Sequence, residues 1–348
     1  MSKKNIYEQY KAKVSNNENY TDEKKKKYLE QIEILKAKNS EIILNTYHFS
    51  NLVGIKWNTL KKIIDDPDKF YYNFQISKKT GGKRTINVPN NSLELCQKYI
   101  KEKILDNVKL HSAAHGFVNN KSIITNAKVH VNSEMILNID LKNFFPSISR
   151  KKVFYIFNKI CGYDNSLSHC LTKLVMYKNG LPQGACTSPI ISNIVTFKLD
   201  LRLKKLSDKL GLNYSRYADD ITFSGNKNVI NSKFLDFVKT IINECGYQIN
   251  DKKTRFESKC GRQEVTGLIV NNGKVSIPKQ YIQNLRKDLY YIKKYGIEEH
   301  KKRNNIYNAF YQEHIKGQIM FVYSVSKNKG IKLLKKYNLI FDDTKYGN

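Results

Sequence analysis

The chain has 348 residues and a formal net charge of +30, from 61 lysines and arginines against 31 aspartates and glutamates. This excess favours a polyanionic partner and predicts binding that weakens with salt. There is no run of 18 or more apolar residues, and the polar, basic amino terminus lacks the hydrophobic stretch of a signal peptide, so we expect a cytoplasmic protein without a membrane partner.

Aromatic residues make up 11% of the chain and include 23 tyrosines, which leaves many rings available for stacking on bases. An AT-rich genome would also enrich Lys, Asn, Ile and Tyr, so part of this bias has a second explanation. The six cysteines form no Cys-x-x-Cys pair and no Cys/His cluster of zinc spacing, which predicts reduced structural thiols.

Residues 1–50 are rich in Lys, Glu, Asn and Tyr, and the apolar residues between Tyr28 and Lys36 have helical spacing. We expect a basic helical extension whose role the sequence does not disclose. A further helical stretch, residues 52–72, is broken at Asp66-Pro67.

Residues 74–89 predict two strands around a Gly-Gly turn, with cations near the bend at Lys78, Lys79, Lys83 and Arg84. A basic hairpin tip can fold over a triphosphate, although exposed basic turns are common. Residues 93–105 predict an amphipathic helix.

Residues 135–139 form an apolar run short enough for a buried strand, and Asp140 lies at its carboxyl end. Phe144 and Phe145 follow within one turn. Either ring could press against a nucleotide sugar, and either could belong to the core.

Residues 151–177 are rich in helix-forming patterns and lead to the loop Asn179–Asn193, which contains Leu-Pro-Gln-Gly. Gln183 offers hydrogen-bond donors and acceptors, and Gly184 lets the backbone approach a substrate closely. A helix through Leu210 follows.

Residues 213–225 are β-prone on both flanks of Asp219-Asp220 and predict a hairpin with this pair at its tip. Two carboxylates held about 4 Å apart would repel by roughly 4 kcal/mol at an effective dielectric of about 20, and Mg²⁺ relieves such repulsion. A solvated turn is the alternative for an isolated pair. If the Asp140 strand end meets this tip, three carboxylates suit two metal ions that clamp an in-line phosphoryl displacement.

After a predicted helix at residues 231–245 come Asn250-x-x-Lys253-Thr254 and the segment Glu264–Val270. From Pro278 the chain reads as mainly helical with a basic surface. We expect three regions: the extension at 1–50, a central part at 51–270 and a helical part at 271–348.

Taken in order, Lys-Arg, Asp140-x-x-x-Phe-Phe, Leu-Pro-Gln-Gly, Tyr-Ala-Asp-Asp and Asn-x-x-Lys-Thr resemble a reverse transcriptase. Asn126-Ala-x-x-His130 and Val265-Thr-Gly267 further resemble elements of the bacterial retron branch. The resemblance implies an α+β right-hand polymerase. Its fingers and its palm, an antiparallel sheet with the Tyr-Ala-Asp-Asp hairpin, would occupy 51–270, and its helical thumb 271–348.

The resemblance also implies site roles. Asp140, Asp219 and Asp220, with the Leu141 carbonyl, would bind two Mg²⁺ ions. The expected nucleotide and template contacts are Lys83, Arg84, Leu141, Phe144, Phe145, Gln183 and Gly184. Phe145 would exclude a 2′-hydroxyl, and Lys253 would protonate the leaving pyrophosphate. The expected RNA contacts are Asn126, His130, Val265, Thr266 and Gly267, although His130 could equally be a satisfied core histidine.

The implied function is RNA-directed DNA synthesis from dNTPs on a cognate structured non-coding RNA. Retrons imply priming from the 2′-hydroxyl of an internal guanosine, a branched RNA–DNA product and phage defence with an accessory effector protein. Group II intron-type and diversity-generating reverse transcriptases remain alternatives, as does an RNA-binding protein with a degenerate polymerase fold. A metal-dependent cyclase or nuclease would lack Leu-Pro-Gln-Gly and the fingers cations.

Overall fold

An antiparallel sheet of four strands lies at the centre of the chain, in the order β4-β5-β3-β6. The computed structural model describes residues 3–77 and 81–341. The strands are β3 (Met135–Asp140), β4 (Asn213–Tyr217), β5 (Asp220–Gly225) and β6 (Arg255–Ser258). The mixture of helices with an antiparallel sheet confirms the predicted fold class, and both the Asp140 strand and the hairpin at residues 213–225 form as expected.

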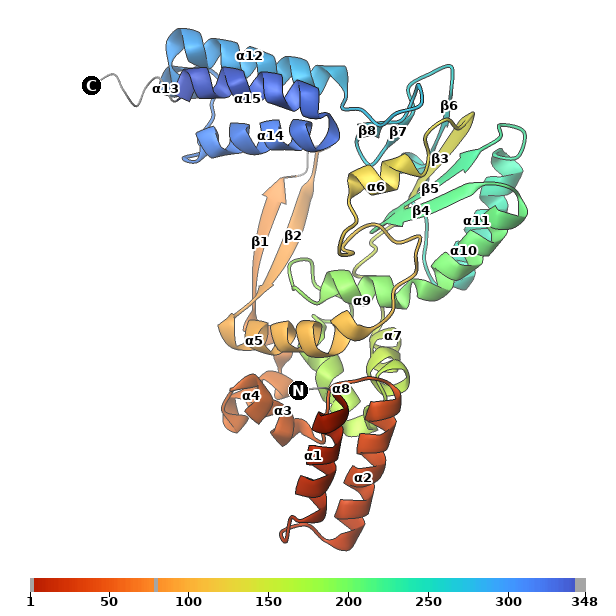
Figure 1. The fold of residues 1–348 in the computed structure, drawn as a ribbon, viewed down its shortest axis with the longest axis vertical. Coiled ribbons are helices and arrows are strands. Elements are labelled where there is room, and N and C mark those ends of the chain that lie inside the picture. Colours follow the sequence, from red (N-terminus) through yellow and green to blue (C-terminus); the bar gives the residue numbers. More distant parts are fainter. Residues whose placement is uncertain (1–2, 78–80, 342–348) are drawn as a thin grey trace.

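The two faces of this sheet have different surroundings because neighbouring residues of a strand point to opposite sides. Leu137 and Ile139 of β3 belong to the large core beneath helices. Ile136 belongs to a second core on the other side, and Asn138 and Asp140 follow it on that face. The helices of the first core include α7 (Arg150–Tyr155), α8 (Asn165–Val175), α9 (Ser188–Val195), α10 (Phe197–Lys209) and α11 (Ser232–Glu244). Figure 1 shows α10 and α11 beside the sheet.

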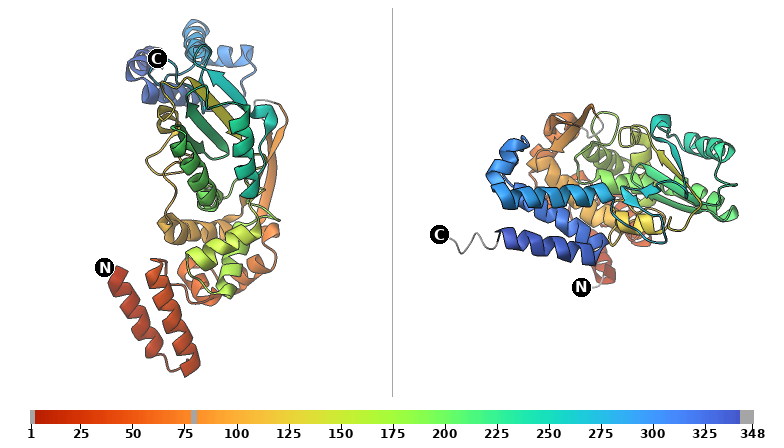
Figure 2. Two further views of the ribbon diagram at one scale, coloured as in Figure 1. Left: turned by 90° about the vertical axis from the view of Figure 1, so that its right-hand side faces the viewer. Right: turned by 90° about the horizontal axis from the view of Figure 1, so that it is seen from above.

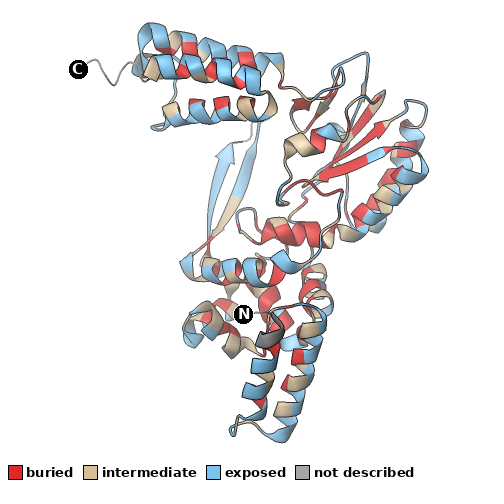
Figure 3. Cartoon of the chain, in the orientation of Figure 1, coloured by how far each residue is buried: buried red, intermediate tan, exposed pale blue. Residues whose placement is uncertain are grey.

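The region predicted as the fingers is a long hairpin standing on short helices (Figure 1). Strands β1 (Tyr71–Ser77) and β2 (Lys83–Pro89) pair in register along their whole length. All of β1 beyond Tyr71 is exposed, as is the start of β2 (Figure 3). Lys78 and Lys79 lie outside the described residues. The supporting helices are α3 (Thr46–Val53), α4 (Trp57–Asp65), the 3-10 turn η1 (Pro67–Phe70) and α5 (Asn91–Tyr99).

The amino-terminal region is a helical hairpin of α1 (Lys3–Ser15) and α2 (Asp22–Ala37), which projects from the body of the molecule (Figure 2). Its own small core includes Tyr7, Tyr28 and Ile32. Gln31 anchors it by donating to the Gly162 carbonyl at 2.7 Å. The helical character expected here is confirmed.

The carboxyl-terminal region is a helical bundle, as predicted for the thumb. Its helices are α12 (Lys279–Tyr295), α13 (Ile297–Arg303), α14 (Tyr311–Val325) and α15 (Lys327–Phe341). Their core continues into the small hairpin β7 (Glu264–Val265) and β8 (Leu268–Ile269) and the short helix α6 (Ile123–Lys128). Among the described residues, no helix is long and apolar enough to cross a membrane.

All six cysteines fall within the described residues and carry free thiols, which confirms the expectation of reduced cysteines. Burial raises the pKa of the Cys96, Cys161 and Cys170 thiols to about 12. These side chains are packing groups rather than nucleophiles.

Candidate active site

Strand register brings the three aspartates together. Asp140, the last residue of β3, pairs directly with Asp220, the first residue of β5. Tyr217 pairs with Asp220 across the neighbouring hairpin, so Ala218 and Asp219 form a two-residue turn. The Leu141 amide donates to the Asp219 carbonyl at 3.0 Å, which joins the turn to the end of β3. The predicted convergence of Asp140 with the Asp-Asp tip is confirmed.

The turn itself has an uncommon backbone conformation. Ala218 has φ of +57°, in the left-handed region that residues with a Cβ disfavour. Its amide lies so close to Gly116 that a Cβ there would approach the Ala218 nitrogen to 2.7 Å. Tertiary contacts therefore hold the turn in a shape that its local sequence does not favour.

The electrostatics of the site are those of crowded negative charge. Partial burial, followed by repulsion from Asp219 and Asp140, raises the pKa of Asp220 to about 7, although the residue as a whole is exposed. Burial also raises the pKa of Asp219, while Lys253 and Arg84 oppose the shift. The Lys253 ammonium donates to Asp140 Oδ2 at 2.7 Å, and this hydrogen bond raises the pKa of Lys253.

These residues fit divalent cations. Mg²⁺ is commonly held by one or two carboxylates together with waters and substrate phosphates. Within residues 3–77 and 81–341, no three His, Cys, Asp or Glu side chains already form a metal cage. The raised pKa of Asp220 and the ammonium on Asp140 show that the site gathers more negative charge than it balances, which a bound cation would offset.

The fingers hairpin and the Leu-Pro-Gln-Gly loop lie against each other. The Asn87 amide of β2 donates to the Gln183 carbonyl at 2.7 Å. Gly184 has φ of +135°, and a Cβ there would approach the Asn87 carbonyl oxygen to 2.7 Å. The absence of a side chain at Gly184 therefore also lets the fingers strand approach closely, and its expected contact with a substrate stays a prediction. Lys83 and Arg84 are exposed on the same strand, and Arg84 acts on Asp219 electrostatically.

The two adjacent phenylalanines have different surroundings. Phe144 is buried in the large core against Tyr247, so its side chain fills the interior. Phe145 is half-buried and contacts Phe117, which also contacts Tyr217 beside the Ala218-Asp219 turn. Phe117 was not singled out from the sequence. The glycine before it, which packs on Ala218, was the available signal.

Asn126 and His130 point inward from the α6 segment. His130 is fully buried, and its two ring nitrogens lie 2.8 Å from Ser224 Oγ and 2.6 Å from Ser215 Oγ. The Ser215 hydroxyl in turn donates to Asn126 Oδ1 at 2.7 Å. This network ties α6 to β4 and β5. Direct contact of these side chains with RNA would require the network to open.

The Val265-Thr-Gly267 segment is the tight turn of the β7–β8 hairpin. Val265 is buried, whereas Thr266 and Gly267 form a two-residue turn with φ of +47° and +83°. Both turn residues line a cavity of about 450 Å³ that also contains Asp140, Asp220 and Lys253. The turn thus lines the same cavity as two of the aspartates.

Several residues that line this cavity were not predicted from the sequence. The Thr222 hydroxyl donates to Asn138 Oδ1 at 3.0 Å, and Asn138 donates to the Glu264 carbonyl at 3.0 Å. Arg255 follows the Asn-x-x-Lys-Thr segment directly and lines the same cavity. Asn138 and Thr222 alternate with apolar residues on β3 and β5, and this period of two was a usable signal for the cavity-lining face.

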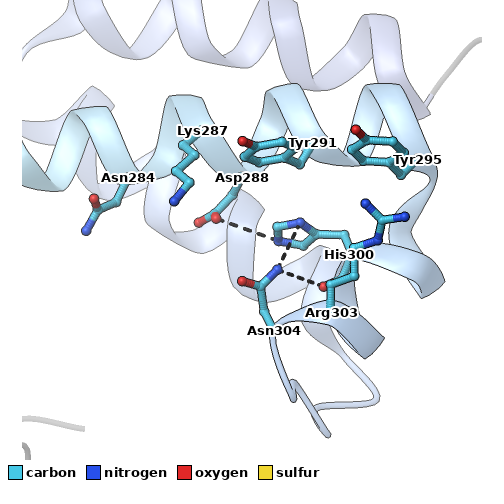
Figure 4. A pocket seen from close by; sticks show the side chains of 8 residues that line it. All are labelled: Asn284, Lys287, Asp288, Tyr291, Tyr295, His300, Arg303 and Asn304. Carbon is cyan, nitrogen blue, oxygen red and sulfur yellow. Dashed lines mark hydrogen bonds and ion pairs between the residues drawn. The ribbon is translucent and has the colours of Figure 1, made fainter.

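A second cavity, of about 580 Å³, lies in the thumb between α12 and α13 (Figure 4). Tyr291 and Tyr295 form one wall, and Arg303 lies over the Tyr295 ring at 4.2 Å. The buried His300 lies 3.6 Å from Asp288 at its floor. No residue of this cavity belongs to the predicted site.

Comparison with known proteins identifies the family. Residues 76–294 match the family described as "Reverse transcriptase (RNA-dependent DNA polymerase)". The chain is 34% identical over 308 residues to the Retron Ec86 reverse transcriptase of Escherichia coli, covering 88% of this chain and 92% of that protein. The chain belongs to the retron reverse transcriptases.

Further retron enzymes extend this similarity. The Retron Se72 reverse transcriptase of Salmonella heidelberg (strain 579083-10) is 30% identical, with 83% of each chain covered. The Retron Mx162 reverse transcriptase of Myxococcus xanthus is 32% identical, covering 79% of this chain and 62% of that longer protein. The retron prediction is therefore confirmed over the group II intron-type and diversity-generating alternatives. This reverse transcriptase is an RNA-directed DNA polymerase, of a family that generally uses divalent metal ions, and its template is RNA.

Proposed function

We propose that Asp140, Asp219 and Asp220, with the Leu141 carbonyl, bind two Mg²⁺ ions at the site of DNA synthesis. The observation that carries the proposal is the direct pairing of Asp140 with Asp220 beside the Asp219 turn. When bound, such ions lower the pKa of a primer hydroxyl and neutralise phosphate charge.

Other residues of the chain would orient the incoming dNTP. Lys83 and Arg84 supply positive charge on the exposed fingers strand, from which Arg84 already acts on Asp219. Phe145 stands half-buried beside Phe117, where a ring can exclude a 2′-hydroxyl. Gln183 and Gly184 lie beside the fingers strand, where template and nucleotide would meet. Phe144 supports Phe145 from the core.

Lys253 would change partners during the reaction. In this structure its ammonium neutralises Asp140. If Asp140 instead held a divalent cation, the Lys253 ammonium would be free to face the phosphates, where it could donate a proton to the leaving pyrophosphate.

The chemical assignment is tested by Asp219→Asn. We expect the rate of primer extension on an annealed RNA template to fall on the order of 10⁴-fold, because the three aspartates act together and one of their carboxylates is lost. Asp251→Asn is the matched control, since its carboxylate is exposed and pairs with Lys239 at 3.0 Å. Full activity of the Asp219 variant, with metal titration unchanged, would disprove the assignment.

We further propose that the natural template is a cognate structured non-coding RNA, the msr-msd transcript of a retron. Synthesis would start from the 2′-hydroxyl of an internal guanosine and give branched RNA–DNA, within an antiphage system that includes an effector protein. The retron relatives support this proposal, and the charge of +30 supports extensive RNA contact.

The Thr266-Gly267 turn would contact that RNA, with Asn126, His130 and Val265 holding the turn from behind. Thr266→Ala removes a hydroxyl that makes only long contacts, donating to the Ile123 carbonyl at 3.5 Å and accepting from Asn126 at 3.5 Å. It leaves the core closed, whereas substitution of the buried Val265 would open it. We expect reduced use of the cognate RNA and unchanged extension of a generic annealed primer. Val265→Ala is the contrasting variant and should destabilise the protein for both templates. Equal loss on both templates with Thr266→Ala would contradict the RNA role.

A further inference from the structure

A fully buried ion pair lies directly beneath the catalytic turn. Arg216 of β4 and Asp200 of α10 both have side chains with 0% exposure. The guanidinium is held at both ends, with Nε to Oδ1 at 2.7 Å and Nη2 to Oδ2 at 2.6 Å. Tyr214 donates its hydroxyl to the same carboxylate at 2.7 Å. This arrangement leaves the third nitrogen of the guanidinium, Nη1, for other partners.

That nitrogen reaches the turn itself. Arg216 Nη1 donates to the Ala218 carbonyl at 3.0 Å and to Asn193 Oδ1 at 3.1 Å. Asn193 donates in turn to the Gly116 carbonyl at 2.8 Å, in the segment that packs on Ala218. One guanidinium thus connects α10 and α9 to the Ala218 carbonyl and, through Asn193, to the Gly116 segment that packs on Ala218.

The contact fixes a particular peptide. The Ala218 carbonyl belongs to the peptide that precedes Asp219, and the Asp219 carbonyl, in the peptide that follows, accepts from Leu141. Both peptides flanking Asp219 are therefore hydrogen-bonded, one to the Arg216 side chain and the other to the Leu141 backbone amide. Ala218 is at the same time in the left-handed region, which an alanine seldom occupies unless held there.

We propose that Arg216, oriented by Asp200, is a positioning residue: it locks the Ala218–Asp219 peptide so that the Asp219 carboxylate is preset for a divalent cation. The inference rests on the proposed metal role of Asp219. Arg216 touches neither substrate nor metal, and it acts through the turn. Buried groups that orient a metal ligand affect affinity and rate without taking part in the chemistry.

The test uses Arg216→Lys in the full chain. Lysine keeps the positive charge for Asp200, but one ammonium cannot reproduce the rigid fork that also reaches the Ala218 carbonyl. We expect kcat in primer extension to fall about 100-fold, as for a small misplacement of a reacting group. The KM for dNTP should stay within about threefold, because nucleotide contacts are intact.

A second readout is independent of catalysis. Binding of Mn²⁺ alone to the free protein, followed by the electron paramagnetic resonance signal of unbound Mn²⁺, should weaken about tenfold, within the range seen when groups supporting a metal ligand are altered. Tyr214→Phe is the matched control, because it removes one hydrogen bond to Asp200 and leaves the contact with Ala218. We expect it to behave as the parent enzyme in both assays.

The outcomes separate the two proposals. If Asp219→Asn retains the parent Mn²⁺ affinity, the metal assignment fails. If Asp219→Asn loses it while Arg216→Lys matches Tyr214→Phe, only the positioning role fails. Should Arg216→Lys not fold, the paired variant Arg216→Met with Asp200→Leu removes both charges together and is measured in the same way. Parent-like Mn²⁺ binding by the paired variant, or its failure to fold, would overturn the positioning role in favour of a purely structural one.

Discussion

Two hairpins bring charge to the site, and they are built in opposite ways. The β4–β5 hairpin carries Asp219 and Asp220 between a helix-covered face, which contains the Arg216–Asp200 pair, and a face closed by His130. The β1–β2 hairpin carries Lys83 and Arg84 and is exposed along most of its length. The proposed metal ligands require fixed geometry, whereas the cations proposed to close over a nucleotide need freedom to move. The difference in burial matches this difference in proposed role.

The largest effect should follow from leaving a buried charge unpaired. Asp200→Ala removes the partner of Arg216 and should lower the free energy of unfolding by about 3–5 kcal/mol, measured by denaturant titration. Asp208→Ala on the same helix is the control, because its exposed pair with Lys204 is worth at most about 1 kcal/mol. A small loss with Asp200→Ala would mean that water enters this side of the catalytic hairpin.

A second prediction concerns the other face of the catalytic hairpin and its dependence on pH. Burial lowers the pKa of His130 to about 3 from an ordinary value near 6.5. Between these two pH values the histidine is protonated in the unfolded chain and neutral in the folded chain. Stability contributed by neutral His130 is complete above about pH 6.5 and is lost as pH falls, by about 1.4 kcal/mol per pH unit and thus about 2 kcal/mol at pH 5.

His130→Gln should flatten this slope in unfolding curves measured between pH 5 and pH 7. His115, whose pKa burial lowers to about 4, should leave a residual slope of the same sign. His314→Gln, at an exposed position of α14, is the control and should leave the slope intact. An unchanged slope in the His130 variant would show that the buried ring is already charged or hydrated.

Substitutions in the exposed β1–β2 hairpin should alter nucleotide binding rather than the free energy of unfolding. Arg84→Ala should raise the KM for dNTP about tenfold through loss of a phosphate contact, while changing the free energy of unfolding by less than about 0.5 kcal/mol. Lys233→Ala, an exposed position on α11, is the control for loss of one positive charge. A stability loss in Arg84→Ala comparable with that of Asp200→Ala would erase the contrast between the two hairpins.

The smallest effect is expected at a turn that needs positive φ but has free space. Gly267→Ala should destabilise by about 1 kcal/mol, because φ is +83° and no atom lies within 4 Å of the added methyl group. Gly184→Ala should destabilise more, since its methyl group meets the Asn87 carbonyl. Thermal unfolding measures both variants. Equal losses would mean that the fingers strand moves aside at Gly184.

The parts of the site that the sequence predicted are those with local signals. Asp140 ends an apolar run, and Asp219-Asp220 interrupts a β-prone segment, so each could be assigned to a strand end or a turn from its neighbours alone. Their convergence then followed from motif order. The helical thumb followed from periodicity in the same way.

The remainder depended on contacts between distant segments. Arg216 looks like one more cation of a basic chain, and nothing near it in sequence indicates that Asp200 buries it. The packing of Gly184 against Asn87 could not be predicted, because Asn87 lies far away in the sequence. Likewise, the sequence left His130 open between RNA contact and a satisfied core histidine, because its hydroxyl partners come from the distant strands β4 and β5. Tertiary burial, rather than local pattern, decided each case.

The pairing of Asp140 with Asp220 makes this site unusually intolerant of changes in chain length. Because successive residues of a strand face opposite sides, deleting one residue between Met135 and Ile139 would turn the carboxylate away from the cavity and into the helices. Repacking of neighbouring side chains can accommodate substitutions along β3, but it cannot restore a strand register that has moved by one residue. The number of residues in β3 before Asp140 is therefore a stricter requirement than the identity of the apolar side chains it carries.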